Sequence, residues 1–259
     1  MSAEYDSILV VSFGGPEGPD DVMPFLEKVV RGRNVPRERL VEVSQHYHHF
    51  GGVSPINART RELIAALEGE LAAHGPKLPI YWGNRHWHPF LEDTLRTMRA
   101  EGRRKALAFV ASAFSSYSGC LAYREEIAEV RDAIGEGAPE VDKIRPFFNH
   151  PGYVETCIDR VREGLEALGP DGERAHVLFS AHSIPEAMAA GCDYEAQLDE
   201  LCRLVADALD VSRWRLVYQS RSGPPHVPWL EPDVCDALGE LAAEAPGAAV
   251  VVAPVGFVA

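Results

Sequence analysis

The stretch at residues 176–185, HVLFSAHSIP, decides the fold expected for this chain. Its apolar run at 177–179 is typical of a strand that is covered on both faces. Pro185 prevents the strand from continuing with a full ladder of hydrogen bonds, so the strand is expected to end near His182. Ligands of open α/β sheets bind outside the carboxyl ends of the strands. This position favours His182 as a ligand or base over the alternative of a histidine that caps a neighbouring carbonyl group or helix.

Strands and helices alternate along the chain on both sides of this stretch. Periodicity and turn residues predict strands at residues 7–12, 78–82, 105–113, 142–148, 176–182, 213–219 and 248–254. Helices are predicted from about residue 20 and at 60–74, 90–102, 152–168, 194–209 and 233–245. The pattern predicts an α/β fold of two doubly wound, Rossmann-like lobes, residues 1–150 and 151–259, with a cleft between them.

The composition is that of an ordinary globular protein. The chain has 259 residues, of which 46% are apolar and 25% charged, and a formal net charge of −14. Because binding of a phosphate backbone needs a basic face, this charge argues against a nucleic-acid partner. Any acidic substrate must be held by a local group of donors against the unfavourable overall field.

The sequence does not show the pattern of a secretory signal or of a membrane span. Residues 1–15 lack a basic region and a cleavage site, and the apolar stretch at 247–259 is short and interrupted by Pro254 and Gly256. We therefore expect a cytoplasmic protein without a transmembrane segment. The five cysteines lie far apart without a C-x-x-C pair, which fits neither a disulfide scaffold nor a complete zinc or iron–sulfur site.

Two segments of the first half carry further candidates for binding. Residues 44–50, SQHYHHF, contain His46, His48 and His49, whose spacing includes no i, i+4 pair. An aromatic pocket wall with imidazole and hydroxyl donors is therefore favoured over a shared metal site. Arg31 follows the first predicted helix, where it either complements the negative end of the helix dipole or receives a carboxylate.

Seven motifs follow one another along the chain: SFGGP, RGR, HYHHFGGVSPIN, YWGNRHWHPFLED, SAHSIP, YQSRSGPPHVPWLEPDV and VAPVGFVA. Each is a weak signal alone, but the ordered set with its spacing resembles the ferrochelatases of the actinobacterial type over essentially the whole chain. The resemblance implies a lyase of heme and porphyrin biosynthesis that inserts ferrous iron into coproporphyrin III and forms iron coproporphyrin (coproheme). We expect such a protein to be a monomer.

The resemblance also assigns roles to individual residues. His182 matches the histidine of the family that binds the metal and accepts a proton, and a neutral imidazole can do either near pH 7. Phe13 matches a position at which related enzymes often carry a tyrosine that faces the macrocycle. A phenyl ring can stack on a porphyrin but cannot ligate iron.

The other matched positions concern the carboxylates of the substrate. Ser54 and Tyr123 match positions that contact iron coproporphyrin, and both side chains can donate to a carboxylate. Arg31, His46 and Tyr47 match positions that line the same pocket. Arg31 is the best candidate for a bidentate carboxylate clamp.

The carboxyl-terminal end departs from the family pattern. In the family, GFVA is followed by an acidic segment whose glutamate pairs with the histidine, and then by a closing helix, whereas this chain ends at Ala259. We therefore expect a shortened chain with an incomplete second lobe, whose own activity stays open. The resemblance also offers Cys157 as the internal ligand of a [2Fe-2S] cluster in a full-length parent, with the other three cysteines beyond Ala259.

Three other functions stay open on the sequence. A protoporphyrin IX ferrochelatase shares the same motifs and differs in the number of substrate carboxylates. A shortened chain could bind porphyrin without inserting a metal. A cobalt or nickel chelatase of the same two-lobed fold would share the histidine but is expected in shorter chains with different motifs.

Overall fold

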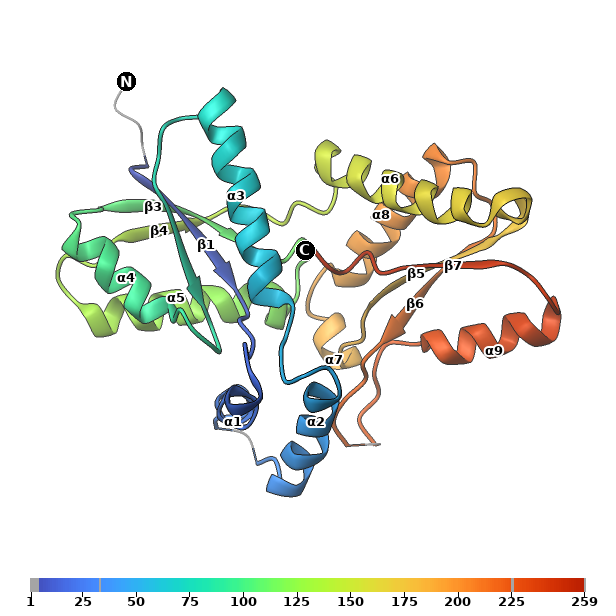
Figure 1. Ribbon diagram of the computed structural model, residues 1–259, viewed down its shortest axis with the longest axis horizontal. Coiled ribbons are helices and arrows are strands. Elements are labelled where there is room, and N and C mark those ends of the chain that lie inside the picture. Colours follow the sequence, from blue (N-terminus) through green and yellow to red (C-terminus); the bar gives the residue numbers. More distant parts are fainter. Residues whose placement is uncertain (1–4, 33, 225, 259) are drawn as a thin grey trace. The chain divides into compact units, whose positions relative to one another are not determined.

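The computed structural model of this chain describes residues 5–32, 34–224 and 226–258. The chain forms two compact units, one of residues 5–111 and 123–144, the other of residues 112–122 and 145–258. These ranges differ from the predicted lobes 1–150 and 151–259 in their ends and in the segment 112–122. Each unit contains one fully parallel β-sheet (Figure 1).

The first unit is built on a sheet with the strand order β2-β1-β3-β4. Its strands are β1 (Ser7–Ser12), β2 (Ile80–Asn84), β3 (Lys105–Val110) and β4 (Glu140–Lys143). The α-helices are α1 (Val22–Val29), α2 (Arg37–His49), α3 (Ile56–His74), α4 (Leu91–Ala100) and α5 (Ala122–Ile134), with a short helix at Pro19–Asp21. All six residues of β1 are buried, as expected for a central parallel strand. The chain leaves the carboxyl end of β1 towards α1 and α2 (Figure 1).

The second unit is built on a sheet with the strand order β6-β5-β7. Its strands are β5 (His176–His182), β6 (Trp214–Gln219) and β7 (Val250–Ala253). The helices are α6 (Pro151–Ala167), α7 (Glu186–Ala189), α8 (Tyr194–Ala208) and α9 (Val234–Glu244), with a π-helical turn at Tyr117–Leu121 and a 3₁₀ helix at Gly169–Arg174. Phe179 is fully buried in the core of this unit, and β5 ends at His182. The strand predicted from HVLFSAHSIP is therefore confirmed.

The segment 112–122 joins the core of the second unit. The Phe114 ring packs on the rings of Phe148 and Tyr194, at centroid distances of 6.2 and 6.0 Å. The Ser115 N–H donates to the Gln197 side chain at 2.7 Å, and Gln197 Nε2 donates back to Ser115 Oγ at 2.9 Å. The chain thus passes between the units at 111–112, 122–123 and 144–145.

The bounds of two predicted strands were wrong because proline has no N–H to donate to a sheet. The strand predicted at 142–148 ends at Lys143, because Pro146 has no N–H and the Phe147 N–H donates to the Ala113 carbonyl instead. The strand predicted at 78–82 runs from Ile80 to Asn84, after Pro79.

The segment 44–50, predicted as a pocket wall, is mostly the last part of α2. Among the described residues, no helix is both long enough and apolar enough to cross a membrane.

Candidate active site

The carboxyl end of β1 places Phe13 beside His86, which follows β2. The Phe13 and His86 ring centroids lie 4.4 Å apart, and the Phe13 side chain is 37% exposed. The backbone joins the two segments, because the N–H of His86 donates to the Phe13 carbonyl at 2.9 Å and that of Arg85 to the Ser12 carbonyl at 3.0 Å. The two strand ends therefore present a phenyl ring and an imidazole as neighbours.

Phe25 connects Phe13 to the residues of α2. Its buried ring lies 6.2 Å from the ring of Phe13 and 5.9 Å from that of Tyr47. Burial raises the pKa of Tyr47 above its usual value, so its hydroxyl stays a donor at neutral pH. His46 is exposed next to Tyr47 on α2. Of the predicted site residues, the structure thus groups Phe13 and Tyr47 around Phe25.

The three histidines of α2 do not form a metal centre. His46, His48 and His49 lie in its last turn, and all three are exposed. Within residues 5–32, 34–224 and 226–258, no three His, Cys, Asp or Glu side chains are grouped as a metal site would require.

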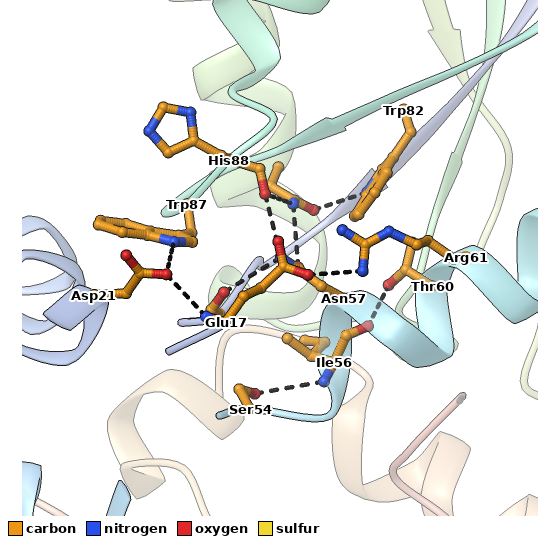
Figure 2. Close-up of polar contacts among 12 residues, drawn as sticks. Glu17, Asp21, Ser54, Ile56, Asn57, Thr60, Arg61, Trp82, Trp87 and His88 are labelled. Carbon is orange, nitrogen blue, oxygen red and sulfur yellow. Dashed lines mark hydrogen bonds and ion pairs between the residues drawn. The ribbon is translucent and has the colours of Figure 1, made fainter. Parts of the chain in front are cut away.

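Ser54 lies directly against the glycine turn that follows β1. A Cβ on Gly15 would lie 2.6 Å from the Ser54 Cβ and 2.7 Å from its Oγ, so only glycine fits beside this serine. The Ser54 N–H donates to the Pro16 carbonyl at 2.8 Å, and Ser54 Oγ accepts from the Ile56 N–H at 3.4 Å at the start of α3 (Figure 2). The structure therefore brings Ser54 to the same strand end as Phe13.

Tyr123 is buried in the core of the first unit, and burial raises the pKa of its hydroxyl far above the usual range. The Arg85 guanidinium lies over its ring, 5.7 Å from the centroid. Arg85 Nε lies 2.7 Å from Glu126 Oε2, and both side chains are mostly buried. Burial raises the pKa of Glu126, against the opposing effect of Arg85. Tyr123 thus neighbours a charged pair that sequence reasoning did not single out.

Arg31 lies just beyond α1, which ends at Val29. Its N–H donates to the Lys28 carbonyl at 3.2 Å, and its side chain is exposed. This placement fits both the dipole interpretation and that of a carboxylate clamp.

His182 ends β5 and is the last residue paired with β6, opposite Gln219. The Tyr194 hydroxyl donates to the His182 carbonyl at 3.0 Å, which fixes the backbone there. The residue is exposed, yet enough protein surrounds the imidazole that burial lowers its pKa below the usual value. The imidazole is therefore neutral at pH 7 and able to accept a proton or a metal ion.

The loop that contains Trp229 is tied to the segment after His182. The Ser183 hydroxyl donates to the Leu230 carbonyl at 2.8 Å, and the Leu230 N–H donates to the Ile184 carbonyl at 3.0 Å. Trp229 forms an antiparallel bridge with Pro185. Its Nε1 is buried and has no hydrogen-bond partner among the described residues.

Cys157 lies on α6 and packs against the core of the second unit. Burial raises the pKa of its thiol to about 11, so the group is a neutral thiol at pH 7 when no metal ion is bound. Within the described part of the chain, Cys157 does not belong to a group of three metal-ligating side chains.

Sequence reasoning missed Arg85, His86 and Glu126, and two buried amides, Asn57 and Asn84. The available signal was the polar loop YWGNRHWHPFLED at the exit of a predicted strand, which marked the place but not the side chains. Glu126 gave no such signal, since an acidic residue within a helix is ordinarily exposed.

The chain is similar to known proteins over nearly its whole length. Residues 5–259 match the family model described as Ferrochelatase. A ferrochelatase of Rhodopirellula baltica is 59% identical over 254 residues, which cover 98% of this chain and 72% of that protein. The coproporphyrin III ferrochelatases of Streptomyces coelicolor and Mycolicibacterium vanbaalenii are 51% and 52% identical, over 99% and 100% of this chain and 73% and 77% of theirs.

Solved structures show the same fold at low sequence identity. SirB from Bacillus subtilis with Fe3+ has a TM-score of 0.58 and 13% identity, over 95% of this chain and 74% of that one. The predicted α/β architecture of the chelatase type is thereby confirmed. On the match of residues 5–259 and on the identity to these relatives, the chain belongs to the ferrochelatase family.

Proposed function

We propose that this protein inserts ferrous iron into coproporphyrin III and forms iron coproporphyrin. The observation that carries the proposal is the identity of 51–52% over nearly the whole chain to relatives named coproporphyrin III ferrochelatase. In this reaction one Fe²⁺ enters the macrocycle and two pyrrole protons leave, so the protein must supply a proton acceptor and hold a large planar substrate.

His182 is the proposed catalytic residue. Its imidazole stands at the carboxyl end of a buried parallel strand, where open α/β sheets bind their ligands. The lowered pKa leaves it neutral, with one ring nitrogen free to take a pyrrole proton or to contact the incoming iron.

Phe13 and His86 are proposed to pack against the macrocycle. Their rings are adjacent, and the Phe13 ring is partly exposed, which suits contact with a flat aromatic ligand. Because a phenyl ring carries no lone pair, Phe13 contributes contact area and orientation only.

The remaining predicted residues are proposed to receive carboxylates. Arg31 offers an exposed guanidinium. Ser54 and Tyr123 offer hydroxyl donors. His46 and Tyr47 are proposed to line the same pocket from α2.

We further propose that the protein acts as a monomer in the cytoplasm. The proposal rests on the family resemblance, and sedimentation together with cell fractionation tests it.

The test of the catalytic assignment compares two histidines of one strand. His182→Ala should lower iron insertion by at least about a hundredfold, measured as the loss of coproporphyrin fluorescence with ferrous iron under anaerobic conditions. His176→Ala, at the opposite end of β5, should insert iron at the wild-type rate. Undiminished turnover in His182→Ala would exclude the proposed role.

A competition experiment tests the substrate. Coproporphyrin III carries two more carboxylates than protoporphyrin IX, so it should have the higher kcat/KM if Arg31, Ser54 and Tyr123 receive them. Preference for protoporphyrin would assign the chain to that alternative. Tight porphyrin binding without iron insertion would indicate a binding module.

A further inference from the structure

Two buried amide side chains lie behind the proposed porphyrin-binding residues of the first unit. Asn57, on the first turn of α3, is 1% exposed, and Asn84, at the end of β2, is 0% exposed. Buried amides are expensive to desolvate, so their hydrogen bonds determine what they do.

The two amides share one acceptor and bond to each other. Asn57 Nδ2 donates to the Gly15 carbonyl at 3.3 Å and to the His88 carbonyl at 3.2 Å. Asn84 Nδ2 donates to the same His88 carbonyl at 2.9 Å and to Asn57 Oδ1 at 3.3 Å. Asn84 Oδ1 accepts from Trp82 Nε1 at 2.9 Å. The Nδ2 groups of both amides therefore donate to carbonyl oxygens. Figure 2 shows Asn57 close to His88.

These hydrogen bonds join three segments that are far apart in the sequence. One is the turn after β1, which contains Gly15 and follows Phe13. The second is the start of α3, which Ser54 precedes. The third is the loop after β2, which contains His86 and the His88 carbonyl.

The segments are too close for side chains to separate them. A Cβ on Gly14 would lie 2.9 Å from the Asn84 Cβ and 2.9 Å from the Trp87 N. The two amides thus provide side-chain hydrogen bonds across a narrow gap between backbones. A change in their donor pattern must move the loops themselves.

We propose that Asn57 and Asn84 are positioning residues, whose shared hydrogen bonds hold Phe13, Ser54 and His86 in the arrangement that binds the porphyrin. The inference rests on the proposed function, because the ligand of this surface is taken from it. Neither amide is assigned contact with the substrate.

The test replaces each amide with its carboxylate isostere. Asn57→Asp and Asn84→Asp keep the size of the side chain but remove the donors and place an oxygen against the His88 carbonyl. We expect the Kd for coproporphyrin III, from fluorescence titration, and the KM to rise about tenfold or more, with kcat at saturating porphyrin changed less than about threefold. A merely structural role would instead reduce the amount of active protein and so lower the apparent kcat at unchanged KM.

Thr94→Val is the matched control. Thr94 is buried close to the same loop, and its hydroxyl donates to the Trp82 carbonyl at 2.7 Å and to the Phe90 carbonyl at 3.1 Å, but not to Gly15 or His88. It should keep the wild-type Kd and KM. Should the Asp variants not fold, Asn57→Ala and Asn84→Ala, which introduce no charge, are measured in the same way with the same expectation.

The outcomes separate the inference from the proposed function. Wild-type Kd and KM in folded variants would overturn the inference while the function stands. Porphyrin binding by the wild type without iron insertion would overturn the function, and the Kd values would still decide the inference. A wild type that binds no porphyrin would overturn both.

Discussion

Both β1 and β5 are buried parallel strands that are followed by polar segments. Buried side chains contribute more of the hydrogen bonds that hold the segment after β1 than of those that hold the segment after β5. After β1, backbone hydrogen bonds from Arg85 and His86 are supplemented by the side-chain hydrogen bonds of the buried Asn57 and Asn84. After β5, backbone groups make most of the hydrogen bonds, as in those from the Ser183 N–H to the Gln219 carbonyl at 2.8 Å and from the Glu186 N–H to the Pro228 carbonyl at 3.1 Å. Substitution of either amide should therefore disturb the first strand end, whereas the His182 side chain makes none of the hydrogen bonds given for the second strand end and should be replaceable with little effect on its surroundings.

The largest loss of stability is expected from a substitution in the core that packs on β5. Phe179 is fully buried, so Phe179→Ala should lower the free energy of unfolding by about 3–5 kcal/mol. Urea denaturation followed by circular dichroism measures this value. A loss below about 1 kcal/mol would show that the core under β5 is loosely packed.

Alanine substitutions of two glycines, one near each strand end, allow the packing at the two ends to be compared through the loss of stability. The Cβ of Gly15→Ala would meet Ser54 at 2.6 Å and Ile56 Cγ2 at 2.8 Å, and this overpacking should cost about 1–3 kcal/mol. The Cβ of Gly256→Ala would lie no closer than 3.3 Å to Ala181, so that variant should lose less than about 1 kcal/mol. Equal losses in the two variants, measured by urea denaturation, would contradict the comparison.

The pH dependence of iron insertion tests the role of His182 at the end of β5. Because burial lowers the pKa of His182, the neutral imidazole should persist below pH 6.5 and the rate should fall only at more acidic pH. The free energy of unfolding should also fall towards acidic pH. Because the His182 pKa is higher in the unfolded chain, the unfolded chain binds the proton first, and stability is lost as the pH falls below 6.5. An acidic limb at or above pH 6.5 in the profile of kcat/KM would contradict this placement.

The smallest effect is expected at the ion pair beside the first strand end. The hydrogen bond from Arg61, at 2.7 Å, is the largest cause of the lowered pKa of Glu17. The pair therefore stabilises the fold above the usual glutamate pKa of 4.5 and loses this effect as the pH falls below it. Both side chains are substantially exposed, so Glu17→Gln should cost only about 0.2–1 kcal/mol at pH 7 and less at pH 3. A larger loss at pH 3 than at pH 7 would refute the assignment.

The sequence was sufficient to predict the fold and the position of His182, because the apolar run and Pro185 are local signals. It predicted Phe13 and Ser54 through the family resemblance, and the structure brings both to one strand end. Asn57, Asn84 and Glu126 could not be predicted, since their burial depends on contacts between segments such as 12–16, 54–57 and 84–90. The predicted roles of Arg31, His46, Tyr123 and Cys157 stay predictions.

The passage of segment 112–122 into the second unit has a consequence for folding. A fragment that begins near residue 145 would lack Phe114, which packs on Tyr194 in that unit's core, and Ser115, which is hydrogen-bonded to Gln197. Neither unit is a continuous piece of chain, so cutting at one site separates neither of them intact. Synthesis on the ribosome must therefore supply the chain well beyond residue 144 before the core around Phe114 can close, so the segment 112–122 has to wait for the rest of its own unit.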